Sequence, residues 1–322
     1  MGEEAPELEK LVSNELNRSA PEAACHLADE IRRRHGASVA SVVFYGSCLR
    51  KQTQEGVLDF YVLVDSYRAA YSSRVLAWLN TALPPNVFYL EIDSPVGTLR
   101  SKYAVISTTD CEAATAPKSL RTSIWARFSQ PAVAVYTRDE EARRALVGAA
   151  ATAVRTALEQ GLMLLPGESE SICVRPDELW QHTLQATYGV EMRPEAPETI
   201  RSVILAAPER FDRATRAGLE ALAHAGRLTW QDRGEQVHVM LPMKQRQRAQ
   251  RAWNRRKPLR KGIYLIALLK SATTFGDWLP YVLWKLERHT GERIEVTDRQ
   301  RHHPLIWGWP VLARVLRQRL LK

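Results

Sequence analysis

Short apolar runs alternate with amphipathic stretches along the first two hundred positions of the chain. Runs rich in β-branched and aromatic residues predict strands, and apolar positions three or four residues apart predict helices. The predicted strands cover 41–45, 57–64, 87–92, 102–107 and 132–136, and the predicted helices cover 21–35, 71–83, 119–128, 139–165 (interrupted near Gly161) and 176–186. Because strands and helices alternate, the sequence predicts an α/β (α+β) domain with a mixed sheet.

The hydrophobic pattern changes after Pro208. A helix predicted over 211–225 precedes two strand-like runs, 227–231 and 235–241, which a polar Asp-Arg-Gly turn joins. Such a helix-plus-hairpin unit is typical of a winged helix, a module that binds DNA in some proteins and only packs in others. Further helices are predicted over 262–273 and 278–289. We therefore expect a domain over 1–200, a helical, winged-helix-like module over 201–243, and a basic helical region over 244–322.

Positive charge is concentrated in the last quarter of the chain. The formal net charge is +9, yet residues 244–322 hold 19 Lys and Arg against 5 Asp and Glu, whereas residues 1–243 hold 26 against 31. The run 244–261 carries nine positive charges and no acid. Such a segment predicts a polyanionic partner, either nucleic acid or an anionic bilayer.

The final stretch has the pattern of a helix that lies in a membrane interface. Leu305, Trp309 and Leu312 would share one face of it, with Arg314 and Arg317 turned away. A terminal helix docked on the protein's own core remains the alternative. Together with the basic run, the pattern favours the bilayer over nucleic acid, at about 1 kcal/mol per Lys or Arg near an anionic surface.

Several absences narrow the class of protein. No apolar window approaches the ~18 residues that a membrane span needs, and the acidic amino terminus lacks the pattern of a signal peptide. The four cysteines, Cys25, Cys48, Cys111 and Cys173, form no C-x-x-C pair, which indicates a reducing compartment and no structural zinc. We expect a cytoplasmic protein that is peripheral on the inner face of the membrane.

Candidate chemistry lies in the stretch 42–65, VVFYGSCLRKQTQEGVLDFYVLVD. A strand runs into Gly46-Ser47, and the next strand carries Asp59 near its start. Glycine lets the backbone approach phosphate oxygens, and amide N–H groups that follow it point at the anion. A carboxylate on the neighbouring strand can hold a divalent ion that bridges those phosphates. The stretch therefore resembles the nucleotide site of polymerase-β-type nucleotidyltransferases, and the resemblance implies Mg²⁺ on Asp59.

The general pattern of polymerase-β-type sites has a second acid, Asp or Glu, two residues after the first. Here Tyr61 stands at that position. Asp65 shares the strand face, but at ~3.3 Å per residue it lies ~20 Å away, so with Ser66 it is expected to cap the next helix. Glu91 or Asp93, at the end of a nearby strand, is the available second metal ligand, although solvated strand-end acids would look the same.

Several segments resemble the mitochondrial-type phosphatidate cytidylyltransferases, also called translocator-maintenance proteins, and their bacterial relatives. The matching segments occur in the family's order over roughly 40–195, and residues 200–322 match poorly. They are FYGS at 44–47, LDFYVLVD at 58–65, KYAVIST at 102–108, ARFSQPAV at 126–133, LMLLP at 162–166 and Y-x-x-E-x-R at 188–193. The family's own strand has one acid followed by hydrophobic residues, as here. Gln130 departs from the family, which is expected to have a lysine there.

The resemblance implies a Mg²⁺-dependent enzyme that converts CTP and phosphatidic acid to CDP-diacylglycerol and pyrophosphate. Gly46, Ser47 and Lys102 would then hold the triphosphate, and Asp59 would hold the metal ion. Arg127 and Arg193 are expected to clamp phosphates or else to pair with surface acids, and Tyr188 is expected in the core.

Two other functions stay open at this point. One is a nucleotidyltransferase that acts on RNA, protein or a small molecule, with the basic region on nucleic acid. The other is a catalytically inactive relative that serves as a membrane scaffold, which Tyr61 motivates. The sequence leaves the base preference, the acyl preference and the oligomeric state open.

Overall fold

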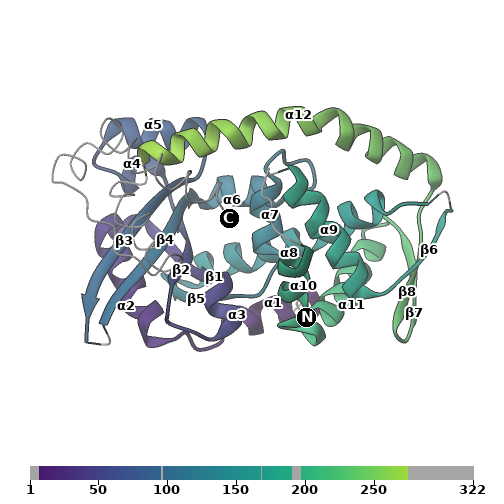
Figure 1. Ribbon diagram of the computed structural model, residues 1–322, viewed down its shortest axis with the longest axis horizontal. Helices are drawn as coiled ribbons and strands as arrows, with labels where there is room; N and C mark the ends of the chain where they lie inside the picture. Colours follow the sequence, from purple (N-terminus) through teal and green to yellow (C-terminus); the bar gives the residue numbers. More distant parts are fainter. Residues whose placement is uncertain (1–6, 96, 168, 191–196, 275–322) are drawn as a thin grey trace, which may run out of the picture.

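The computed structural model describes residues 7–95, 97–167, 169–190 and 197–274. Arg193 and the helices predicted over 278–289 and at the carboxyl end lie outside these residues. A five-stranded mixed sheet and surrounding helices make up most of the described chain (Figure 1). The protein is therefore a mixed α/β structure, as the alternation of strands and helices predicts.

The sheet has the strand order β3-β4-β2-β1-β5. Its strands are β1 (Val39–Tyr45), β2 (Val57–Val64), β3 (Asn86–Ser94), β4 (Gly97–Ser107) and β5 (Ala132–Thr137). Only β2 and β4 pair in parallel, and the other neighbours are antiparallel. All five strands were predicted. Strands β3 and β4 extend further than expected because they form a long hairpin, in which Ser94 pairs with Gly97.

Both faces of the sheet are buried, and side chains alternate between them along each strand. Phe44, Phe60 and Val62 point into one core, which α2 (Glu22–His35), α4 (Tyr67–Ala70) and α5 (Arg74–Ala82) cover. Val43, Tyr61 and Leu63 point into the other core. That second core is closed by α1 (Glu7–Leu16), α6 (Thr108–Thr115), α7 (Thr122–Phe128), α8 (Glu140–Leu164) and α9 (Pro176–Val190). We call this second side of the sheet the α8 face.

Three helix predictions need correction. The helix expected over 71–83 is α5, which begins only at Arg74, and a separate short helix, α4, precedes it. Ser66 caps α4 by accepting a hydrogen bond from the Ala69 N–H. The predicted interruption near Gly161 is wrong, because α8 is continuous there. A side chain at Gly161 would collide with Thr183 of α9, so this glycine permits close helix packing instead of ending the helix. Helices α1 and α6 were missed.

A second, three-stranded sheet follows the helix pair α10 (Pro197–Leu205) and α11 (Pro208–His224). The predicted hairpin is present as β7 (Thr229–Arg233) and β8 (Gln236–Met240), and β6 (Ser171–Val174), which was not predicted, pairs with β8. Strand β6 comes before the expected domain boundary at residue 200, and β7 and β8 come after it. The small sheet is therefore built from residues on both sides of that boundary. The boundaries at 200 and 243 remain predictions.

Helix α12 (Met243–Thr274) is one continuous element, although the sequence suggested a basic run followed by a separate helix over 262–273. It runs along one side of the molecule from the small sheet to α5 (Figure 1). Near its end, Lys270 donates hydrogen bonds to the Leu83 and Pro85 carbonyls, and Thr274 donates to the Val87 carbonyl at 3.0 Å. The basic helix is therefore fastened to the edge of the main sheet.

Candidate functional site

The bend after β1 requires glycine for two separate reasons. Gly46 has φ +92° and ψ −160°, a backbone conformation that residues with a Cβ rarely adopt. A Cβ at this position would also lie 2.7 Å from Asp59 Oδ2. The Asp59 carboxylate therefore rests directly against the bend, as expected from the eleven residues that separate Ser47 from Asp59 in the sequence.

Asp59 sits in a row of side chains that crosses the sheet. It pairs with Tyr45 of β1 on one side and with Lys102 of β4 on the other. Paired residues of neighbouring strands point to the same face, with Cα atoms about 5 Å apart. Asp59 and Lys102 are both half-buried. The sheet thus brings a carboxylate, an ammonium group and the glycine bend together on the α8 face.

Ser47 is the first residue of α3 (Ser47–Lys51) and is exposed beside this group. Helix α3 ends at Gln52, which adopts the left-handed conformation with φ 49°. Its short length returns the chain to β2 close to where it left β1. This connection therefore places Ser47 and Asp59 at the same end of the neighbouring strands β1 and β2.

Tyr61, two residues beyond Asp59, is part of the core. It is 4% exposed, and its ring centroid lies 5.1 Å from that of Tyr45 and 4.9 Å from that of Phe128. An aromatic cluster thus occupies the position where the general pattern has a second metal-binding acid.

Glu91 and Asp93, the candidate second metal ligands, lie on β3, which β4 separates from β2. At about 4.8 Å between strands and 3.3 Å per residue, the Cα atom of Glu91 is about 12 Å from that of Asp59. Glu91 accepts hydrogen bonds from Tyr89 at 2.7 Å and Arg100 at 2.9 Å, and Asp93 accepts one from Thr98. Burial and the bond to Glu91 raise the pKa of Tyr89. Across the described part of the chain, no three His, Cys, Asp or Glu side chains form a metal-binding group.

Arg127 lies on α7, on the α8 face, where it is half-buried and donates a hydrogen bond to the Ser123 carbonyl at 2.7 Å. Its contact with phosphates stays a prediction. Gln130 is buried and bonds to the Ala126 carbonyl at 2.8 Å and to the Tyr188 hydroxyl at 3.5 Å. Tyr188 is in the core, as expected.

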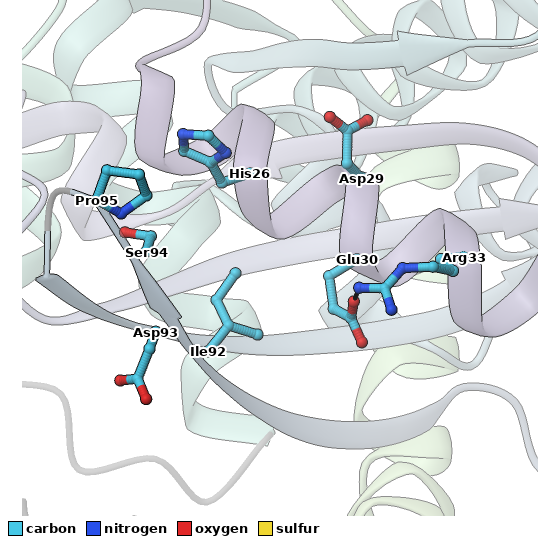
Figure 2. Close-up of a pocket in the computed structure, with 8 residues that line it drawn as sticks. All are labelled: His26, Asp29, Glu30, Arg33, Ile92, Asp93, Ser94 and Pro95. Atoms are coloured by element: carbon cyan, nitrogen blue, oxygen red, sulfur yellow. Dashed lines mark ion pairs between the residues drawn. The ribbon is translucent and has the colours of Figure 1, made fainter.

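Figure 2 shows a hollow on the opposite side of the sheet, between α2 and the end of β3. Glu30 and Arg33 of α2 pair with each other in it, and Asp93 points away from the helix residues. Because Gly46, Asp59 and Lys102 are not among its lining residues, this hollow is not part of the candidate site.

Sequence reasoning missed Arg121 and Arg260, which line a second cleft between α7, the end of α9 and α12. Arg260 looked like one of many solvated charges in the basic run. Trp253 was a usable signal for Arg260. Two residues seven positions apart on a helix lie on the same face, so an aromatic ring was expected beside this arginine. The ring of Trp253 and the Arg260 guanidinium do stack, at 4.0 Å.

No protein-family model and no curated protein sequence matches the chain.

Proposed function

We propose that the chain is a magnesium-dependent cytidylyltransferase of the nucleotidyltransferase fold, which transfers the cytidylyl group of CTP to phosphatidic acid. The observation that carries the proposal is the contact between the Asp59 carboxylate and the Gly46 bend. Lys102 beside Asp59 supports it, as do the family-like segments around these residues.

The triphosphate would lie over the Gly46 bend. Without a side chain at Gly46, the backbone is open to close approach by phosphate oxygens. The exposed Ser47 hydroxyl and the Lys102 ammonium group would complete the contacts, because a point charge on a flexible stem suits a phosphate.

Asp59 fits a magnesium ion in this arrangement. Mg²⁺ is commonly held by one or two carboxylates together with water and substrate phosphates, so one protein acid beside a triphosphate is sufficient. When held by Asp59, the ion would supply positive charge that offsets the charge of the triphosphate. Glu91, whose carboxylate already bonds to Tyr89 and Arg100, is the weaker candidate for a second ligand.

In the proposed reaction, a phosphate oxygen of phosphatidic acid forms a bond to the α-phosphorus of CTP while the bond to pyrophosphate breaks. The acceptor phosphate is already anionic, so no protein base is required. Lys102 and Ser47 would stabilise the charge that collects on the leaving pyrophosphate. Positioning and charge neutralisation account for catalysis in such a site.

The outward side of α12 supports a membrane-bound acceptor. Its first half exposes Arg251, Arg255 and Lys257. Its second half exposes large apolar side chains instead, with Leu265 47%, Ile266 60% and Leu269 63% exposed. A cationic stretch followed by an apolar one on the same helix suits an anionic bilayer surface. In the described residues, no helix is both long and apolar enough to cross a membrane.

Helix α5 adds to this surface. Val75 and Trp78 are 65% and 67% exposed, and α5 lies beside the end of α12 (Figure 1). Since Lys270 bonds to the Leu83 carbonyl directly after α5, the two apolar groups belong to one end of the molecule. Several large exposed apolar side chains at one end of a protein are typical of an interaction surface.

Tyr61 favours a second candidate function, a catalytically inactive scaffold on the same surface. Its packing against Tyr45 and Phe128 leaves one acid at the bend instead of two. Such a protein would float with anionic vesicles but would not bind CTP.

The test compares wild-type protein with Asp59→Asn and with Asp65→Asn, an acid on the same strand face but away from the bend. Each protein is incubated with Mg²⁺, each labelled nucleoside triphosphate and phosphatidic acid vesicles, and the lipid product is measured. We expect a cytidine-lipid product that Asp59→Asn abolishes and Asp65→Asn preserves, with both variants folded. Undiminished product from Asp59→Asn would refute the assignment. Vesicle flotation beside RNA retention separates a lipid enzyme from one that acts on nucleic acid.

A further inference from the structure

Arg260 is a buried cation that lacks a hydrogen-bonding partner for most of its donors. It is 4% exposed, and its Nε and Nη1 atoms find no partner among the described residues. Its guanidinium stacks on the Trp253 ring, which compensates only part of the lost hydration. Leaving buried donors unsatisfied is costly, so such a group calls for a physical explanation.

Arg246, on the same helix, shows what a structural arginine looks like. It is 2% exposed, and it donates from Nη1 to the Ser169 carbonyl and from Nη2 to the Leu165 carbonyl at 2.8 Å. Only its Nε lacks a partner. Arg246 thus fastens α12 to a loop, whereas Nε and Nη1 of Arg260 make no such bond within the part of the chain that the structure describes.

Arg260 faces a narrow cleft that also collects other positive charges. Arg121 lines the cleft from the start of α7, together with Thr122 and Ser123. Burial lowers the pKa of Arg121, with Tyr61, Tyr67 and Asp110 acting in the opposite direction. Asp110 itself is engaged by hydrogen bonds from Tyr67 and Ser107.

Lys270 lies further along α12 than Arg260, and it is close enough to Arg121 to be affected by the charge of that arginine. Burial and that charge lower the pKa of Lys270 to about 7. Burial, followed by the charge of Arg256, lowers the pKa of Arg260 to about 10. Lys270 itself lies outside the cleft, but Arg121 and Arg260 line it and no acid is among its described lining residues, so an anion would relieve their charge.

We propose that the cleft between Arg121 and Arg260 binds the phosphate group of the lipid acceptor. Two guanidinium groups, with hydroxyls from Thr122 and Ser123 nearby, match the oxygens of a phosphate monoester. The identity of the ligand as acceptor rests on the proposed function, but the binding of a phosphate group does not.

The position of the cleft favours the acceptor over the nucleotide. Its inner wall is formed by Arg260, Tyr264 and Ala267 of α12, and the outer side of the same turns carries the exposed Leu265 and Ile266. A lipid with its acyl chains at the outer side can therefore reach the cleft with its headgroup. Arg121, in turn, lies near Tyr61, two residues from Asp59 on the same strand face. About 30 Å³ of the cleft is free, so a phosphate requires the two arginine side chains to draw apart.

The test measures calorimetric binding of dioctanoyl phosphatidic acid, and separately of CTP with Mg²⁺, to the full chain. Arg260→Met keeps the apolar stem over Trp253 but removes the charge. We expect it to weaken phosphatidic acid binding by about tenfold or more, the loss typical of a hydrogen bond to a charged group, and to leave CTP binding unchanged. Arg121→Gln, at a half-exposed position, should act in the same direction. Dioctanoylglycerol lacks the phosphate, so its binding should be the same for the wild type and for every variant.

Arg255→Met is the matched control, because Arg255 is an exposed arginine on the same helix. If Arg255→Met and Arg260→Met weakened phosphatidic acid binding equally, the effect would come from the overall positive charge of the helix, and the proposal would be overturned. Unchanged phosphatidic acid binding in both Arg260→Met and Arg121→Gln would overturn it as well, as would a selective loss of CTP binding. If arginine-dependent phosphatidic acid binding persists in a protein that makes no cytidine-lipid product, the cleft stands and the proposed reaction falls.

Discussion

The two ends of β2 carry acids on the same side of the sheet but use them differently. Asp59, near the start, is pressed against the Gly46 bend and neighbours Lys102. Asp65, just past the end, makes a bidentate ion pair with Arg138, at 2.6 and 3.1 Å, with both side chains about half exposed. The role of each acid is thus decided by what the adjoining strands bring to it.

The difference arises from how β1 enters and leaves the sheet. At the Asp59 end, β1 stops before Gly46, whose missing side chain lets the Asp59 carboxylate lie against the backbone. At the Asp65 end, β1 begins and β5 ends, and Arg138 directly after β5 neutralises the acid. An acid beside a backbone gap can serve a ligand, whereas an acid beside an arginine serves the fold.

The largest effect is expected from placing a second acid at position 61, near the Asp59 end of β2, where the general pattern has one. Tyr61→Asp removes a packed ring and buries a carboxylate, so we expect the free energy of unfolding to fall by about 4 kcal/mol or more. Turnover should not improve. Tyr61→Phe, which keeps the ring, is the control in chemical denaturation. A stable Tyr61→Asp with tighter Mg²⁺ binding would contradict the packing argument.

The next effect breaks the glycine bend itself. Gly46→Ala places a Cβ 2.7 Å from Asp59 Oδ2 at φ +92°, so we expect a loss of stability of about 1–3 kcal/mol from backbone strain. Displacement of the carboxylate should lower turnover about a hundredfold. Gly97→Ala is the matched control, because Gly97 has φ +105° but nothing within 4 Å of its Cβ position. Equal turnover in the two variants would show that the Gly46–Asp59 contact has no role in the reaction.

The smallest effect is expected at the other end of the strand. Asp65→Asn removes an exposed ion pair, which is typically worth about 0.5 kcal/mol. The difference in thermal stability from the wild type should shrink in high salt, because screening weakens exposed pairs. Turnover should be unchanged. A drop in activity would mean that both ends of β2 act on the ligand.

Much of the main sheet and part of the candidate site followed from local sequence. The alternation of side chains in β1 and β2 predicted which residues face each core, and the spacing from Gly46 to Asp59 predicted their contact. Long hairpin pairing extended β3 and β4 beyond their apolar centres. Helix α1 escaped notice because its three buried apolar positions, Leu8, Val12 and Leu16, stand in an acidic segment.

Other features depend on residues far apart in the chain. Glu15 of α1 pairs with Arg210 of α11, at 2.6 Å and 195 positions apart, and also accepts a hydrogen bond from the Ala132 N–H. Such a buried pair is tolerated because the attraction between the two charges and their further hydrogen bonds offset the loss of hydration. Neither residue stands out from other charged helix residues in the sequence.

The sequence by itself determined the strands of the main sheet, the glycine bend and the acid that meets it, because side-chain periodicity and backbone freedom are local properties. Only the tertiary structure decided that Asp65 would be neutralised, that Tyr61 would fill the second acid's place in the core, and that Arg260 would be buried with its Nε and Nη1 unpaired among the described residues. Burial and charge pairing depend on which distant elements pack together, and this information is absent from any single stretch of chain.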